Sequence, residues 1–380
     1  MKVLFITGNL HAYQAKNGFG GIAGLRLIQN LSSQVEERGI LNGQDDAVEF
    51  AETGQWDGCR VWRGPLLKGG MNKSERDFQV SALGEILRIF QPDIIHVFQV
   101  ECWRELLLQA LVGWKIPIVA TALDYGWFCP KTTLVRETGL LCDGHGSQTK
   151  CWPCLTGGRD PIVRAGRWLG KQIPASFANT PILGALVKDA TMNQTRLNLT
   201  LNAWPQFLKS VAHWIAPSRA MQRLLTEQSV PMESISHIPY GYDAPEVKPV
   251  KQTGQNIVFG YAGRGIYEKG FHLLAEAFPV VARQFPDVRL RLFGISQNEN
   301  HRYLRQSLEK LRPVREQVDF DAYDGTDPAS IADAHARISA MIVPSIWYDN
   351  LPLTVVESLA MARRSSLHAI QARQIRCKMR

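Results

Sequence analysis

The sequence predicts an α/β protein of two domains, each built on a mainly parallel β-sheet. Its 380 residues exceed the roughly 250–300 at which one hydrophobic core stops growing. Short apolar runs that end in glycine or a turn alternate with helical patterns, which is typical of βαβ units. The strands disappear over residues 160–212 and then resume. We therefore expect two Rossmann-like domains, residues 1–212 and 213–362, to face each other across a cleft.

The first half of the chain contains the alternation in its simplest form. Three apolar runs have the length of buried strands: residues 3–7, 93–98 and 116–123. Helical patterns are expected at residues 22–37, 75–90 and 103–114. Ser74 is a candidate N-cap for the second of these helices. Residues 160–212 read as a helical insert.

The second half repeats the pattern after residue 212. Its expected strands are residues 213–218, 236–239, 257–262, 288–293, 318–320 and 340–343. Its expected helices are residues 271–285, 300–311 and 352–361. Residues 242–255, rich in Pro, Lys and Gly, are the best candidate for a linker.

The charge of the chain argues against nucleic acid as a partner. The formal net charge is +8, but residues 363–380 contain six Lys or Arg and no acid, which leaves +2 for the rest. Aromatic and basic residues do not interleave as they do in proteins that bind single strands. No apolar run reaches the roughly 18 residues that span a bilayer, and the first strand is too short for a signal peptide. We expect a cytoplasmic protein.

Two pairs of charged residues carry the chemical argument. Arg264 and Lys269 lie in a glycine-containing loop after an apolar strand, where cations bind phosphate at the carboxyl end of a parallel sheet. Asp349 and Glu357 follow another strand, and carboxylates are natural acceptors for the hydroxyls of a sugar or ribose. Together the pairs suit a ligand with a diphosphate at one end and hydroxyls at the other, that is, a nucleotide-sugar.

Each pair has a simpler explanation when taken alone. Arg264 and Lys269 could be surface cations of a solvated turn, and two acids eight residues apart are common on solvated helix faces.

The start of the expected helix offers further contacts. The backbone amides of Asn350 and Leu351 lie there and could reach further hydroxyls.

With these motifs in place, residues 215–361 resemble the C-terminal domain of retaining GT-B glycosyltransferases of family 4. The matching segments are Ala216-Pro217-Ser218, Ile238-Pro239-Tyr240-Gly241-Tyr242-Asp243, Gly263-Arg264 with Lys269-Gly270, and Pro344-Ser345 through Glu357. In the family's E-x7-E motif the first acid is here an aspartate. The resemblance implies that Arg264 and Lys269 hold the donor diphosphate. It also implies that Glu357 holds the ribose and Asp349 the transferred sugar.

The N-terminal half resembles the same family more loosely. Gly20 and Gly21 open the first long helix, where their amides could approach a phosphate; a flexible turn is the alternative. Family members often carry His-Asp after the strand at 116–123, where this chain has Leu123-Asp124. Asp124 is therefore a candidate catalytic residue beside Asp349 and Glu357, without the imidazole. His96 is either a further cleft residue or a structural histidine.

Four of the seven cysteines form a separate cluster in residues 129–154: Cys129, Cys142, Cys151 and Cys154. Inside a cell, such a cluster favours metal over disulfides. Four thiolates would suit a structural zinc ion, with His145 as a substitute ligand. Unligated thiols and a redox role are the alternatives. No catalytic metal is expected.

The chain departs from the family after Met361. Relatives continue with a small turn and another buried strand, whereas residues 363–380 form a basic tail without an apolar run. We therefore expect the second domain to be incomplete, with an exposed sheet edge.

These observations favour a glycosyltransferase of polysaccharide biosynthesis. It would move a sugar from a UDP- or GDP-sugar to a saccharide or lipid-linked acceptor, with retention of configuration. No side chain stands out as a nucleophile, so the departing phosphate would assist attack on the same face. The alternatives are a truncated, inactive relative that binds only a nucleotide or a partner, and a GT-B sugar-nucleotide epimerase. Peripheral association with the inner membrane face is compatible with a lipid-linked acceptor.

Overall fold

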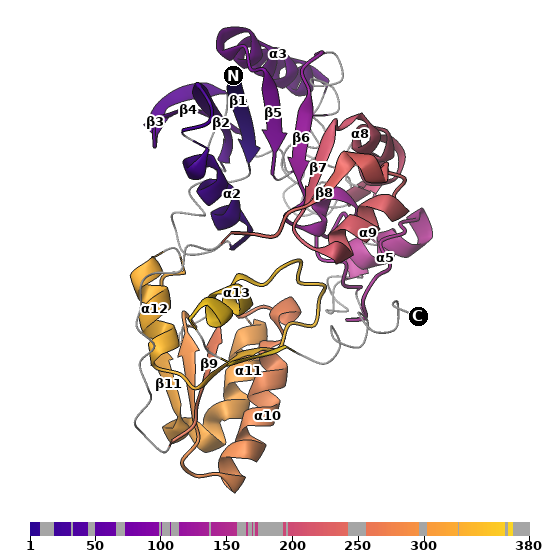
Figure 1. Cartoon of the computed structure of the whole chain (residues 1–380). Coiled ribbons are helices and arrows are strands. Elements are labelled where there is room, and N and C mark those ends of the chain that lie inside the picture. Colours follow the sequence, from indigo (N-terminus) through magenta and orange to yellow (C-terminus); the bar gives the residue numbers. More distant parts are fainter. Residues whose placement is uncertain are drawn as a thin grey trace. The chain divides into compact units, whose positions relative to one another are not determined.

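The computed structural model describes most of the chain and divides into two compact units between Pro239 and Tyr240. The described residues are 1–7, 19–31, 33–44, 50–65, 73–98, 100, 107, 114–136, 138–157, 165, 169, 172–173, 193–194, 197–241, 256–295, 302–325, 327–361 and 364–367. Each unit contains one β-sheet with helices around it (Figure 1). Most of the expected helix at 103–114, the linker at 242–255 and most of the insert at 160–212 lie outside the described residues.

The sheet of the first unit has eight strands in the order β3-β4-β2-β1-β5-β6-β7-β8. Their bounds are β1 Lys2–Thr7, β2 Glu37–Gln44, β3 Ala51–Trp56, β4 Cys59–Pro65, β5 Ile94–Val97, β6 Ile118–Thr121, β7 His213–Ala216 and β8 Ile235–His237. Neighbouring strands run parallel, except that β3 and β4 form an antiparallel hairpin. Both residues of its turn, Asp57 (φ 49°) and Gly58 (φ 73°), have positive φ, as a two-residue type I′ turn requires.

The helices of the first unit differ in part from the prediction. They are α2 Phe19–Asn30, α3 Lys73–Phe90, α5 Gln148–Gly157, α8 Trp204–Ser210 and α9 Arg219–Glu227, with the short helices η1 Tyr125–Trp127, η3 Leu199–Ala203 and η4 Met232–Ser234. The helix expected at 22–37 begins earlier and ends at Asn30, because Glu37 already starts a strand beside β1. Ser74 lies inside α3 rather than at its N-cap position.

The boundary between the units also differs from the predicted one at 212/213. β7 pairs with β6, with Ile215 opposite Thr121, and β8 pairs with β7. Residues 213–239 therefore complete the first sheet. The aromatic rings of Trp127, Trp204 and Trp214 are fully buried there and pack on one another.

The sheet of the second unit is parallel throughout its five strands, in the order β11-β10-β9-β12-β13. The strands are β9 Val258–Ala262, β10 Arg289–Phe293, β11 Val318–Asp321, β12 Ala340–Val343 and β13 Arg364–Leu367. The helices are η5 Tyr267–Lys269, α10 Phe271–Gln284, α11 Arg302–Leu311, η6 Arg312–Gln317, α12 Pro328–Ala336 and α13 Leu353–Ala360. The expected strands and helices between residues 257 and 361 are therefore confirmed to within two residues at their ends.

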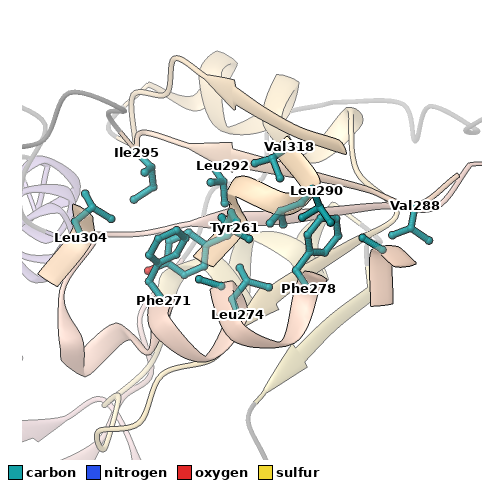
Figure 2. Close-up of a cluster of buried hydrophobic side chains, with 14 residues drawn as sticks. Tyr261, Phe271, Leu274, Phe278, Val288, Leu290, Leu292, Ile295, Leu304 and Val318 are labelled. Atoms are coloured by element: carbon teal, nitrogen blue, oxygen red, sulfur yellow. The ribbon is translucent and has the colours of Figure 1, made fainter. Parts of the chain in front are cut away.

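One face of this sheet is closed by α10 and α11 over an apolar core. Side chains alternate along the strands, so Leu290 and Leu292 of β10 point to the helices, where they meet Phe271 and Phe278 of α10 (Figure 2). Tyr261 of β9 belongs to the same cluster and is 2% exposed. The burial of these side chains holds α10 and α11 against the sheet.

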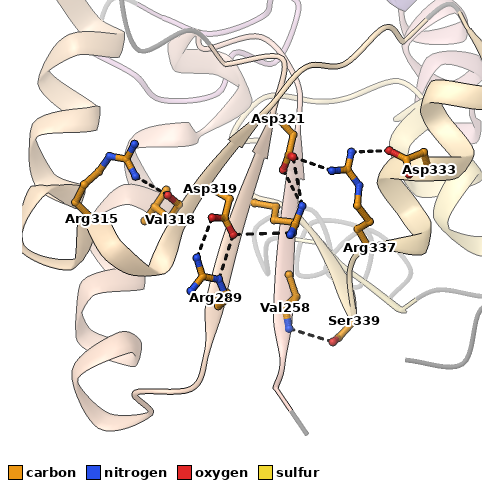
Figure 3. Close-up of polar contacts among 10 residues, drawn as sticks. Val258, Arg289, Arg315, Val318, Asp319, Asp321, Asp333, Arg337 and Ser339 are labelled. Atoms are coloured by element: carbon orange, nitrogen blue, oxygen red, sulfur yellow. Dashed lines mark hydrogen bonds and ion pairs between the residues drawn. The ribbon is translucent and has the colours of Figure 1, made fainter. Parts of the chain in front are cut away.

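The opposite face, beside α12, carries a network of ion pairs (Figure 3). Arg289 forks onto Asp319, with its Nε and Nη2 at 3.1 and 2.8 Å from the carboxylate oxygens. Asp321 accepts from Arg291 at 3.3 Å and from Arg337, which follows α12, at 2.8 Å. Arg289 and Arg291 of β10, and Asp319 and Asp321 of β11, therefore alternate with apolar residues along the two strands.

The predicted absence of a strand after Met361 is wrong. Arg364–Leu367 forms β13, which pairs with β12 in parallel, with Ala340 opposite Arg364 and Val343 opposite Leu367. The backbone makes this pairing, and it does not require the apolar pattern on which the prediction relied. β12 is thus an interior strand.

Among the described residues, no helix combines the length and apolar character needed to cross a bilayer.

Candidate functional site

Two loops of the second unit meet at one edge of its sheet. The basic loop, residues 263–270, follows β9, and the acidic loop, residues 344–352, follows β12. β9 and β12 are parallel neighbours, with Phe259 opposite Ala340. The carboxyl ends of neighbouring parallel strands lie at the same edge, which is where ligands bind in sheets of this type.

The backbones of the two loops are fastened together. The amide of Ile346 donates to the carbonyl oxygen of Glu268 at 3.0 Å. Gly270 has φ of 70°, and a Cβ at that position would lie 2.0 Å from the carbonyl oxygen of Pro344. Residue 270 must therefore be glycine, both for its left-handed backbone and for the close approach of the acidic loop.

Lys269 and Asp349 form an ion pair across the loops. The Lys269 Nζ lies 2.6 Å from the Asp349 Oδ2, and the two side chains are only 17% and 9% exposed. The hydroxyl of Ser345 donates to the same oxygen at 3.2 Å. On another side, the ammonium lies 5.1 Å from the centre of the Trp347 ring, within the range of a cation–π contact. One predicted cation and one predicted acid are thus brought into direct contact.

The side chain of Arg264 is exposed, and a hydrogen bond from the sheet holds its backbone. The hydroxyl of the buried Tyr261 donates to the Arg264 carbonyl oxygen at 3.0 Å. Burial raises the pKa of Tyr261 far above its usual value, and the charge of Asp349 acts in the same direction while that of Arg264 opposes it. Tyr261 therefore stays a neutral hydrogen-bond donor, and the Arg264 side chain is free to approach solvent-borne anions.

Glu357 lies inside the unit, at 1% exposure on α13. Asn350, 8% exposed, and Leu351 precede that helix, as predicted. On the same helix the Ser358 hydroxyl donates to the Thr354 carbonyl at 2.6 Å. Asp349 precedes α13 and Glu357 lies within it, so both predicted acids belong to the segment that follows β12.

An aromatic cluster supports the other end of the basic loop. The Tyr303 hydroxyl of α11 accepts from the His272 amide at 3.1 Å and is 2.8 Å from the His272 Nδ1. The Tyr267 ring stacks on the His272 ring at 4.7 Å with an interplanar angle of 9°. Burial raises the pKa of Tyr303 to about 12. These contacts fix the start of α10, where the loop enters the helix.

The candidates in the first unit have local structural roles. Asp124 caps η1, because its Oδ1 accepts from the Gly126 amide at 2.7 Å. His96 is 6% exposed and hydrogen-bonds Thr121 at 2.8 Å through Nε2. Burial lowers its pKa to about 4. His96 is thus a structural histidine, the second of the two readings that the sequence left open.

Gly20 and Gly21 lie in the first turn of α2, as expected from the sequence. A role for them or for Asp124 in ligand binding stays a prediction.

The cysteine cluster does not support the predicted zinc site. Within the residues that the structure describes, no group of three or more His, Cys, Asp or Glu side chains is arranged to hold a metal ion. Cys129 and Cys151 are buried, and Cys142 and Cys154 are half-buried. The Cys154 thiol donates to the Val135 carbonyl at 3.7 Å, so its sulfur is engaged by backbone. Burial also raises the pKa of Cys151, which disfavours the thiolate that zinc requires.

Three residues of the site carry no role in the sequence prediction: Tyr261, Ser345 and Trp347. Ser345 and Trp347 stand within the motif that contains Asp349, so their proximity along the chain was the available signal. For Tyr261, the sequence indicated only that it belongs to a strand.

Solved structures share the arrangement of elements in this chain. Sucrose-phosphate synthase from Thermosynechococcus elongatus has a TM-score of 0.61 and 15% identity, covering 98% of this chain and 82% of that one. HepE of Anabaena, in complex with UDP-glucose, has a TM-score of 0.58 and 14% identity, covering 97% and 80%. The chain therefore has the GT-B fold of glycosyltransferases, with two Rossmann-like units, as the sequence predicted.

The match to a family covers the second unit. Residues 244–362, which include both loops, match the model of glycosyl transferases group 1. Mannosylfructose-phosphate synthase of Agrobacterium fabrum is 25% identical over 152 residues, which cover 36% of this chain and 33% of that protein. The chain thus matches about a third of that relative's length.

Proposed function

We propose that this protein is a glycosyltransferase that moves a sugar from a nucleotide-sugar to a saccharide or lipid-linked acceptor. The observation that carries the proposal is the contact between Lys269 and Asp349 at the edge of the sheet. It puts a cation suited to phosphate and a carboxylate suited to hydroxyls 2.6 Å apart on two loops that are held together. Both loops lie in the segment that matches glycosyl transferases group 1.

The basic loop would bind the diphosphate of the donor. Arg264 is exposed and can fork onto two phosphate oxygens, while Lys269 adds a point charge. As the bond between the sugar C1 and the phosphate oxygen breaks, negative charge grows on the leaving diphosphate, and these two cations stabilise it.

The acidic loop and α13 would bind hydroxyl groups. Asp349 would accept from hydroxyls of the transferred sugar, and Glu357 from the ribose. Asn350 and Leu351 precede α13, and amides at the start of a helix have no acceptor within the helix. Their backbone amides would therefore donate to further sugar oxygens.

The reaction we propose retains the anomeric configuration, as in family 4. The acceptor oxygen would attack C1 on the face from which the diphosphate departs, and its proton would pass to the leaving phosphate oxygen. Asp124 and the first-turn amides of Gly20 and Gly21 are the candidates for contacts from the first unit. UDP- and GDP-sugars are the donors to test first; support for UDP comes from the UDP-glucose complex of HepE. For a lipid-linked acceptor, we propose peripheral association with the inner membrane face.

A panel of nucleotide-sugars tests the proposal. Purified protein is titrated with each compound by calorimetry, and donor hydrolysis is followed by release of the nucleoside diphosphate. We expect at least one donor to bind to the wild type and to lose tenfold or more of its affinity in Arg264→Ala.

Arg312→Ala is the matched control, because Arg312 is an arginine of the same unit with an 80% exposed side chain that pairs with Glu309 of α11. Binding that falls equally in both variants would show a general charge effect. Absence of binding by every donor would overturn the proposal.

A further inference from the structure

The ammonium of Lys269 is engaged by two neighbouring side chains. Asp349 lies 2.6 Å from it, and Trp347 covers another side at 5.1 Å. An anion that approaches Lys269 therefore meets a carboxylate that holds the same cation. Both side chains are largely withdrawn from water, so the charge of Asp349 is only partly screened.

The two partners differ in their freedom to move. Lys269 has a flexible four-carbon stem, whereas Asp349 has a short side chain held by the Ser345 hydroxyl at 3.2 Å. The backbone near Asp349 is also fixed, because its amide donates to the Trp347 carbonyl at 2.9 Å and Ile346 is bonded to the basic loop. An anion that takes Lys269 would therefore move the lysine side chain rather than the carboxylate.

We infer that Asp349 acts as a selectivity gate at Lys269: it disfavours ligands that end in a bare phosphate and favours phosphates esterified to a group with hydroxyls. The inference deepens the proposed function and rests on it, since it names what distinguishes the donor from its product at the same site.

The physical reason is the charge that the ligand brings next to Asp349. A terminal phosphate of a nucleoside diphosphate carries close to two negative charges near neutral pH, and it would face a fixed carboxylate. The esterified phosphate of a nucleotide-sugar carries one charge, and the attached sugar offers hydroxyls that donate to Asp349. Like charges at this separation repel, while a charge-assisted hydrogen bond attracts.

This selectivity has a consequence for turnover. Transfer of the sugar converts the favoured ligand into the disfavoured one without any change in the protein. Asp349 would then regain Lys269 as the nucleoside diphosphate leaves, so the ion pair in the free protein would speed product release.

The test measures three ligands by calorimetry: inorganic pyrophosphate, a nucleoside diphosphate and the matching nucleotide-sugar. They are titrated into the wild type, Asp349→Asn and Asp349→Glu. Asparagine keeps the shape and removes the charge, whereas glutamate keeps the charge. We expect Asp349→Asn to bind pyrophosphate and the nucleoside diphosphate about tenfold more tightly than the wild type. We expect no gain in affinity for the nucleotide-sugar, and no gain for either phosphate ligand in Asp349→Glu.

Asp333→Asn is the matched control for charge. It removes one negative charge from the same unit at a 61% exposed side chain on α12, which pairs with Arg337 and belongs to neither loop. Pyrophosphate affinity should be unchanged in this variant. The double variant Lys269→Met/Asp349→Asn should lose the gain, because the gain requires the released lysine. If Asp349→Asn does not fold by circular dichroism, Asp349→Ser serves as a second neutral variant.

The pyrophosphate titration separates the two proposals. Tighter pyrophosphate binding in Asp349→Asn, with no donor bound by any variant, would support the repulsion of bare phosphate by Asp349, but it would overturn the proposed function and the preference for esterified phosphates. Donor binding with an unchanged or weaker affinity for pyrophosphate in Asp349→Asn would overturn the gate and leave the proposed function standing. An equal gain in Asp333→Asn would also overturn the gate, because a general charge effect would then explain it.

Discussion

Replacing Gly270 by alanine should loosen the joint between the two loops of the second unit. Alanine would have to adopt φ of 70°, which costs about 1 kcal/mol. Its Cβ would lie 2.0 Å from the Pro344 carbonyl oxygen, so the acidic loop has to move. That movement breaks the 3.0 Å hydrogen bond from Ile346 to Glu268, worth about 1 kcal/mol, and overpacking adds about 1 kcal/mol more. The expected total is about 3 kcal/mol.

Native-state hydrogen exchange measures this loss locally, in peptides that cover α10 and the acidic loop. Gly58→Ala is the matched control. Gly58 has a similar φ of 73°, but its nearest contact would be the Arg38 guanidinium at 3.3 Å, which has to shift by only a few tenths of an ångström. Gly58→Ala should therefore lower the free energy of local unfolding by only about 1 kcal/mol, the cost of the backbone conformation, in peptides of the β3–β4 hairpin. Equal losses in the two variants would show that the contact with Pro344 does not constrain the loops, and the reasoning would fail.

Three further predictions concern burial and charge. The pKa of His96 falls from 6.5 to about 4 on folding, so below pH 6.5 the unfolded chain binds a proton that the folded chain does not. Stability should fall by about 3 kcal/mol between pH 6.5 and 4, and urea titrations of His96→Gln should lack this part of the slope. Tyr261→Phe removes the donor to the Arg264 carbonyl and should cost about 1 kcal/mol in thermal unfolding; an unchanged midpoint would contradict it. Asp321→Asn breaks two partly buried ion pairs and should cost about 1–2 kcal/mol, against less than about 0.5 for the exposed Asp333→Asn; equal costs in urea unfolding would count against this network.

The strands that could be predicted are buried strands that consist of consecutive apolar residues. β12 was predicted with its observed bounds, because both of its faces are covered by helices and its sequence is therefore continuously apolar. β2 and β3 were missed because few of their residues are apolar. The signal that could have found the hairpin is Asp57-Gly58, the turn pair of a two-residue loop. β13 had no such signal, since backbone pairing with β12 forms it.

The candidate site was predictable only as far as the sheet topology goes. Parallel strands bring their carboxyl ends together, so the meeting of Lys269 and Asp349 followed from placing each after a strand. The hydrogen bond from Ser345 and the ring of Trp347 beside the ammonium depend on the path of the acidic loop, which no residue pattern encodes. The predicted zinc site found no support for a related reason, because cysteine spacing says which thiols are close in sequence and not where each sulfur points.

One face of β10 is charged and the other is apolar, and this difference permits only one register of the strand in the sheet. Arg289 and Arg291 alternate with Leu290 and Leu292, so a shift by one residue would drive guanidinium groups into the core and leave leucines facing Asp319. A deletion or insertion of one residue within β10 should therefore be tolerated far less than any single substitution there. β9 takes its alignment from β10, and β12 from β9, so the arginine–aspartate contacts also determine how far the two loops project beyond the sheet.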